Sequence, residues 1–183
     1  MAAPASKTIR DLNGKWSMNK TLSDDVNPTL EIQGISWLTR KAIGLASVHL
    51  HVKQYSDADG TQHIDIEQTA TGGLKGTSEE RRLDNTWREH KDWLFGSARG
   101  RTLFVDEVPE DSGEAATFLK TNWEEGTTEW VYSYVESLDN GWTAKQTWGF
   151  QLINGERRHV RNVVVEKGKK KSETRLVYDW VSE

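Results

Sequence analysis

The sequence predicts an all-β protein in which short antiparallel strands form a sandwich or a barrel. From Val48 onward, apolar and polar residues alternate with the period of two that is typical of a half-buried strand. Polar turn sequences such as those at 139–141 and 154–155 separate the alternating segments. The helical pattern is confined to residues 23–44, and the length of 183 residues predicts a single domain over 1–183.

The alternating segments add up to ten expected strands. One strand at 14–20 precedes the helical region, and a hairpin that begins at Val48 turns at 56–60. The remaining strands are expected at 76–83, 86–94, 101–106, 128–137, 142–152, 156–166 and 173–181. Residues 107–126 are acidic and weakly patterned, so we expect an inserted loop there, with one helical turn near 115–120.

Two short helices are expected between the first two strands. Ser23 is a candidate N-cap because acidic residues follow it in the first turn, and Gly34 can end this helix. The second helix is expected over 35–43, with its end at Gly44. Neither helix reaches four turns, so each must pack against other elements to be stable.

The apolar residues also predict the register of two hairpins. In the first, pairing Leu50 with Ile66 gathers the valine, leucine and isoleucine side chains on one face. The opposite face then carries His49, His51, His63, Asp65 and Glu67. In the second, a three-residue loop at 139–141 pairs Trp148 with Tyr132 and places the aromatic side chains of both strands on one face.

The composition excludes several classes of protein. The chain contains no cysteine, which excludes disulfides and cysteine-bound metals and is consistent with the cytoplasm. No run of 18 apolar residues is present, and the N-terminus lacks the apolar core of a secretory signal. The net charge of −4 argues against nucleic-acid binding, and no cofactor is expected because no dinucleotide or phosphate-binding fingerprint appears.

Tryptophan is frequent in a chain that has few aliphatic residues. Apolar residues make up 35% of the chain and charged residues 28%, yet nine residues are tryptophan. There are too few aliphatic side chains to form a solid core. This imbalance favours a hollow interior lined by aromatic rings, suited to a flat or polycyclic molecule.

The beginning of the chain resembles the intracellular fatty-acid-binding proteins, a family of the calycin (lipocalin) superfamily. Asn13-Gly14-Lys15-Trp16 is similar to the family's Gly-x-Trp start, and residues 34–41, Gly-Ile-Ser-Trp-Leu-Thr-Arg-Lys, are similar to a stretch on its second helix. The order of one strand, two helices and nine strands is also the family's order. The resemblance implies a ten-stranded antiparallel up-and-down β-barrel, a helix-turn-helix lid and a cavity for one lipophilic molecule.

The same resemblance directs attention to the last two strands. The family holds a ligand carboxylate with an Arg-x-Tyr pair on its last strand, but here one extra residue separates Arg175 from Tyr178. Alternation sends these two side chains to opposite faces of a regular strand. Alignment with the family through Asn154 points His159 and Arg161 inward, where Arg161 would anchor an anionic or enolate-like ligand. The alternative is the opposite parity, with both residues in water.

These considerations define a set of candidate ligand-binding residues. The set consists of Trp37, Trp130, Tyr132, Tyr134, Trp148, Phe150, His159, Arg161 and Tyr178. Trp142 belongs to the same aromatic group, whereas Trp16 is expected to be structural, at the closed end of the barrel. For any single aromatic residue, simple filling of the barrel is the alternative.

Two charged clusters are weaker candidates. The histidine and carboxylate face of the first hairpin has ligands that suit a transition metal, but it is opposite the apolar face, so a solvated surface without metal is favoured. Residues Lys167, Lys169, Lys170 and Lys171 surround the turn between the last two strands. They would attract an anionic membrane surface, with a solvated hairpin tip as the alternative.

Two functions are suited to such a cavity. The first is intracellular binding or transport of a small lipophilic ligand, which would be aromatic or anionic. The alternative is a cavity-based isomerase or cyclase that acts on a hydrophobic metabolite, with His159 as base, Arg161 as charge stabiliser and Tyr178 as acid. A protein-interaction role for the acidic 107–126 segment ranks last.

Overall fold

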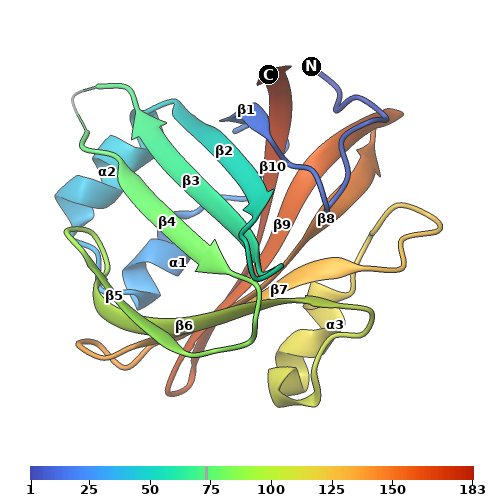
Figure 1. Ribbon diagram of the computed structural model, residues 1–183. Helices are drawn as coiled ribbons and strands as arrows, with labels where there is room; N and C mark the ends of the chain where they lie inside the picture. Colours follow the sequence, from blue (N-terminus) through green and yellow to red (C-terminus); the bar gives the residue numbers. More distant parts are fainter. Residues whose placement is uncertain (73) are drawn as a thin grey trace.

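The computed structural model describes residues 1–72 and 74–183, which form one ten-stranded antiparallel sheet curled into a nearly closed barrel (Figure 1). The strands are β1 (Gly14–Met18), β2 (Val48–Ser56), β3 (Gln62–Ala70), β4 (Thr77–Arg82), β5 (Arg88–Asp92), β6 (Gly96–Val105), β7 (Trp130–Ser137), β8 (Thr143–Ile153), β9 (Glu156–Lys167) and β10 (Lys170–Ser182). β1 pairs with both β2 and β10, whereas β4 and β5 lie at the two ends of the sheet order. The predicted strand order is therefore confirmed, and the barrel has a seam between β4 and β5.

The helices form a lid and an outer cover. α1 (Asn27–Ile32) and α2 (Trp37–Leu45) lie together at one end of the barrel, and α3 (Ala116–Leu119) follows a short 3₁₀ helix, η1 (Glu110–Ala115), outside it (Figure 1). The helical turn expected near 115–120 is thus confirmed. No helix in the described ranges combines the length and the apolar character that crossing a membrane requires.

α1 begins later than the sequence predicts. Its first turn contains Pro28, which suits that position because proline has the helical φ and needs no N–H partner. The predicted cap, Ser23, instead accepts the Val177 N–H at 2.8 Å, and Asp24 accepts the Arg175 N–H at 2.7 Å. These polar residues therefore attach the segment before the lid to β10.

α2 also differs from its predicted bounds. Ser36 caps it by accepting the Thr39 N–H at 3.3 Å, and the helix continues through Gly44 to Leu45. The predicted end of the first helix is confirmed, because Gly34 follows α1 with the positive φ of 83° that glycine allows. The two-helix lid is present, with its second helix shifted by two residues at each end.

The predicted register of the first hairpin is wrong by two residues. Val52, rather than Leu50, lies opposite Ile66. Since side-chain direction repeats every two residues, an even shift leaves every side chain on its predicted face. The apolar residues of β2 and β3 therefore still point into the barrel.

The predicted register of the second hairpin is wrong by one residue, which has larger consequences. Trp148 lies opposite Val131, and the Ser137 N–H donates to the Trp142 carbonyl at 2.8 Å across a four-residue loop. The wider loop is held from outside the hairpin, because Asp139 accepts the Ser97 N–H. An odd shift turns one strand over, so the aromatic residues of β7 and β8 lie on opposite faces.

The barrel wall consequently has an apolar layer on each side. The inner core includes Trp16, Leu50, Ile64, Ile66, Val131, Trp148, Phe150 and Tyr178. On the outer side, the 107–126 segment covers β7 and β9, with Val108, Ala115, Leu119, Tyr132 and Val164 in one cluster. The inserted segment therefore forms a second packing layer outside the barrel wall, and several aromatic residues pack in this layer rather than in the interior.

Candidate functional site

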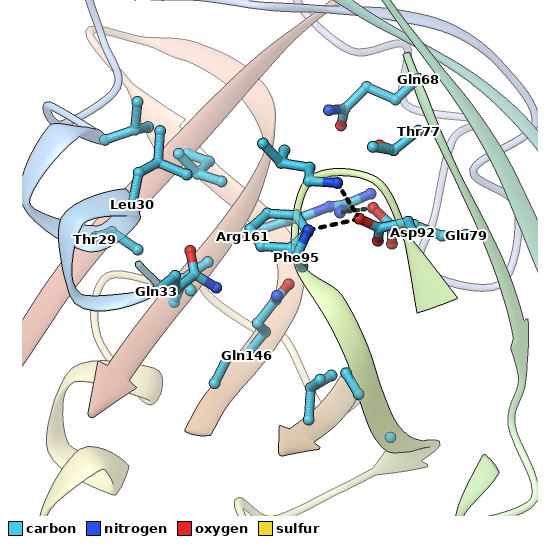
Figure 2. A pocket seen from close by; sticks show the side chains of 18 of the residues that line it. Thr29, Leu30, Gln33, Gln68, Thr77, Glu79, Asp92, Phe95, Gln146 and Arg161 are labelled. Carbon is cyan, nitrogen blue, oxygen red and sulfur yellow. Dashed lines mark hydrogen bonds and ion pairs between the residues drawn. The ribbon is translucent and has the colours of Figure 1, made fainter. Parts of the chain in front are cut away.

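A cavity of about 880 Å³ lies between the lid and the inner core. Its apolar lining includes Leu30, Val48, Phe95, Trp142, Val163 and Leu176, and its polar lining includes Thr29, Gln33, Gln68, Thr77, Gln146 and Thr174. Figure 2 shows the α1 side chains on one side, those of Gln68, Thr77 and Glu79 on the other, and Arg161 between them. The volume and the mixed lining suit an organic ligand of moderate size.

Two guanidinium groups lie over one indole ring at the floor of the cavity. Arg161 Cζ is 3.8 Å from the ring centre of Trp148, and Arg81 Cζ is 4.9 Å from it. Trp148 is fully buried and is fixed by its Nε1–H, which donates to Gln146 at 2.8 Å. The face of an indole ring attracts a nearby cation. Trp148 therefore stabilises both guanidinium charges at a place shielded from bulk water.

Glu79 connects the two arginines. It accepts from Arg81 Nε at 2.8 Å and from Arg161 Nη1 at 3.5 Å. Burial alone would raise the pKa of the Glu79 carboxyl, but the charges of Arg81 and Arg161 outweigh it and lower this pKa to about 2. Glu79 is therefore an ionised carboxylate, and the three side chains together carry one net positive charge.

Arg81 also ties the barrel together beside its seam. Its Nη1 donates to Thr102 on β6 at 3.2 Å and to Ser133 on β7 at 2.7 Å. Since its Nε and Nη2 both bind Glu79, each nitrogen of this guanidinium has a protein partner. Arg81 is thus a structural bridge with little remaining capacity for a ligand.

Arg161 has donors to spare. Within the described part of the chain its hydrogen bonds are limited to Nη1, and its buried Nε has no partner. Tyr178 lines the same cavity, its hydroxyl has no hydrogen-bond partner among the described residues, and its ring centre is 5.5 Å from Arg161 Cζ. Burial raises the pKa of this phenol, so it stays a neutral donor. The floor therefore offers two hydrogen-bond donors, the Arg161 guanidinium and the Tyr178 hydroxyl, to one acceptor atom of a ligand.

His159 points inward as predicted, but it lies beneath the cavity floor. Its ring is packed among Trp16, Phe150 and Tyr178, at centroid distances of 5.3, 5.7 and 5.5 Å. Its Nδ1 donates to the Gly149 carbonyl at 3.1 Å. Burial, helped by the charge of Arg161, lowers the pKa of His159 to about 3. His159 is therefore a neutral core residue that reaches the cavity only through Tyr178.

The other predicted aromatic residues are placed away from the cavity. Trp130, Tyr132 and Tyr134 point outward because of the one-residue register shift, and pack against the 107–126 segment. Phe150 lies in the inner core below the floor, and Trp37 is 60% exposed on α2. Of the aromatic group, only Trp142 and Tyr178 line the cavity within the described residues, with Trp148 directly beneath the arginines.

The last strand follows the predicted alternation. Tyr178 points into the barrel, and Arg175, three residues earlier, points away from it and donates to the Leu22 carbonyl at 3.4 Å. The Arg-x-Tyr anchor of fatty-acid-binding proteins therefore has no counterpart on β10. The anchoring cation of this cavity comes from β9 instead.

The remaining candidates lie on the outer surface. On the outer face of the first hairpin, His63 stacks on Tyr55 and pairs with Asp57 at 2.9 Å, and no metal-binding group of side chains occurs among the described residues. The lysines of the β9–β10 turn are exposed, with Lys167 opposite Lys170. The exposure of these lysines is what a solvated hairpin tip would show.

Sequence reasoning missed Glu79 and Arg81. Both lie on β4, where Thr-Ser-Glu-Glu-Arg-Arg contains no apolar residue that would identify the inner face. It also missed His90 and Asp92 on β5, which line the cavity near its rim with 3.7 Å between His90 Nε2 and the carboxylate. Polar strands carry no periodic signal, so these residues can be placed only by the fold.

The fold is that of the fatty-acid-binding proteins, a nearly closed ten-stranded barrel with a two-helix lid over a cavity. Fatty-acid-binding protein 1 of Echinococcus granulosus has the same fold, with a TM-score of 0.56 over 93% of this chain and 98% of that chain at 15% identity. The probable pericyclase scpY of Mollisia scopiformis is 38% identical over 181 residues, which cover 98% of this chain and 95% of that protein. The chain belongs to the family of this protein.

A second relative supports the same assignment. Pericyclase pydY of Acremonium sp is 31% identical over 182 residues, which cover 99% of this chain and 97% of that protein. No model of a protein family matches the chain. The sequence relatives therefore carry the name of an enzyme, whereas the structural neighbour is a binding protein.

Proposed function

We propose that this protein binds a small lipophilic carbonyl compound in its cavity and catalyses a pericyclic ring closure of that compound. In a pericyclic reaction, bonds form and break in one cyclic transition state, and when the ring closes within one molecule, substrate and product are isomers. The two relatives named as pericyclases support this reaction class. The observation that carries the proposal is the donor pair of Arg161 and Tyr178 at the floor of the cavity.

The first contribution of the protein is confinement. A flexible unsaturated chain must fold so that its reacting ends meet, and a site that holds this conformation removes much of the entropic barrier. The walls contributed by α1, β9 and β10 carry apolar side chains, Leu30, Val163 and Leu176, against which such a chain would pack. Residues such as Val163, Leu176 and Trp142 would set the folded shape.

The second contribution is electrostatic. If a substrate carbonyl lies at the floor, Arg161 and Tyr178 donate to its oxygen and withdraw electrons from the conjugated system. These donors stabilise the charge that develops on the oxygen in the transition state, and the packing of Arg161 on Trp148 fixes one of them in advance. The same arrangement requires no proton transfer, so the buried His159 has no catalytic step to perform.

Binding or transport without catalysis is the second candidate function. The specific observation in its favour is the shared fold with a fatty-acid-binding protein. A cytoplasmic location and a membrane contact of Lys167, Lys169, Lys170 and Lys171 stay predictions under either function.

The test is a reaction in vitro. The purified protein is incubated with the substrate of the Acremonium pericyclase, and chromatography with mass detection follows a product of unchanged mass. The proposal expects this product to form faster than in buffer, and native mass spectrometry to detect one bound substrate molecule. If the protein bound the substrate without accelerating product formation, binding or transport would replace the proposed catalytic function.

A further inference from the structure

The cavity floor contains a carboxylate of its own. Glu79 lies on the inner face of the edge strand β4 and is bound by Arg81 Nε and Nη2, each at 2.8 Å. Its second oxygen faces Arg161 Nη1 on β9, at 3.5 Å. The positive charge that would attract an acidic ligand is therefore partly neutralised before any ligand enters.

We propose that Glu79 determines specificity, so that the cavity favours neutral carbonyl ligands over carboxylates. This inference rests on the proposed binding of a lipophilic molecule in the same cavity. A ligand carboxylate that bound Arg161 would lie next to the Glu79 carboxylate, and two like charges repel strongly where little water screens them. A neutral carbonyl oxygen accepts the same hydrogen bonds without this repulsion.

The engagement of Arg81 strengthens the selection. All three nitrogens of its guanidinium have protein partners, so Arg81 cannot turn toward a ligand without breaking bonds to Glu79, Thr102 or Ser133. A fork of two parallel bonds, which carboxylates prefer, would have to come from Arg161 alone. The Nη1 of Arg161 is already directed at Glu79 and its Nε is buried, so neither pair of parallel N–H groups is free for this fork, and a single oxygen atom suits the site better than a carboxylate.

The experiment compares a charged and a neutral ligand that share the same acyl chain. Binding of oleate and of methyl oleate is measured by tryptophan fluorescence for the wild-type protein and for Glu79→Gln. We expect Glu79→Gln to bind oleate about tenfold or more tightly than the wild type, with methyl oleate changed by less than about twofold. Glu67→Gln is the matched control because it removes the same charge from the exposed outer side of β3, and both affinities should stay unchanged.

The outcomes separate the two proposals. Failure of methyl oleate to bind the wild-type protein would overturn the proposed binding of neutral lipophiles. An unchanged ratio of the two affinities in folded Glu79→Gln, with the ester bound, would overturn the role of Glu79. If Glu79→Gln does not fold, the double variant Glu79→Leu/Arg81→Leu removes the two opposite charges together, while Arg161, Thr102 and Ser133 each lose one bond. It should gain oleate affinity in the same way, and absence of that gain would equally overturn the role.

Discussion

Arg161 and Trp148 face each other as a cross-strand pair on β9 and β8, with Arg161 Cζ 3.8 Å from the indole ring centre. Because the pair is part of the strand register, the guanidinium is oriented before any ligand arrives. The indole shields one face of the cation and leaves its unused donors to the cavity. A preorganised donor of this kind is the feature that turns a binding cavity into a site able to stabilise a transition state.

Replacement of Arg161 by methionine should remove most of the catalysis. Methionine still packs on Trp148, so the fold should persist while the charged donor is lost. We expect kcat for product formation to fall by about 10²–10³, the usual cost of losing a donor to a developing oxyanion. The control is Arg10→Met, which removes an exposed arginine that pairs with Glu129 away from the cavity lining, and it should retain full activity. Undiminished turnover by Arg161→Met would remove Arg161 from the mechanism.

Replacement of Tyr178 by phenylalanine should have a smaller effect in the same direction. The ring still fills the core, and only the hydroxyl that faces the cavity is lost. A neutral hydrogen bond contributes about 1 kcal/mol, so turnover should fall about fivefold. Tyr132→Phe is the matched control, since the Tyr132 hydroxyl binds Ser112 under the 107–126 segment. That control should lower stability without changing turnover, and equal rate losses in both variants would count against Tyr178.

Much of the fold could be predicted from the sequence because strand periodicity is a local property. Alternation revealed the strands of β8, β9 and β10 and sent Arg175 and Tyr178 to opposite faces of the last strand. The turn at 138–141 could not be predicted in this way. Its width depends on the bond between Asp139 and Ser97, which belong to different hairpins, and one residue of loop length decides which face carries the aromatic rings.

The candidate site was predictable only in part. His159, Arg161 and Val163 share one face of β9 by alternation, but the resemblance to the fatty-acid-binding proteins was needed to choose that face as the inner one, because the other face also carries valines. Glu79 and Arg81 share a wholly polar strand, and their role depends on contact with β9 across the cavity. Knowing that His159 points inward was also not enough to assign it a catalytic role. The packing of the core places its ring below the cavity floor, and no sequence pattern predicts that depth.

His159→Gln distinguishes a concerted reaction from one with general-base catalysis. A concerted ring closure requires no proton acceptor, and glutamine retains a donor for the Gly149 carbonyl. We expect turnover within about twofold of the wild type, since loss of a real general base costs about 10²–10⁴. Initial rates at saturating substrate provide the measurement, with thermal unfolding to confirm the fold. A loss of a hundredfold or more, about the lower end of that range, would restore His159 as the base.

His159 should also make stability depend on pH in a defined window. Its pKa is about 3 in the folded protein against 6.5 for the free side chain, so below pH 6.5 the unfolded chain binds a proton that the folded chain does not. Stability should therefore fall as pH falls, by up to about 1.4 kcal/mol per pH unit. The carboxyl of Glu79 adds a similar loss only below pH 4.5. Urea unfolding between pH 6.5 and 4.5 should show the slope in the wild type and a shallower slope in His159→Gln.

Gly14 should be a critical position for the closed end of the barrel. It has a φ of 119°, and a Cβ there would come within 2.4 Å of the Trp180 ring, which itself packs edge-on against Trp16 at 4.9 Å. Gly14→Ala should cost about 3 kcal/mol, as the sum of backbone strain and overpacking. Gly60→Ala shares the positive φ, at 83°, but a Cβ there meets open space, so strain alone should cost about 1 kcal/mol. Urea unfolding measures both variants, and equal losses would mean that Trp180 moves aside without cost.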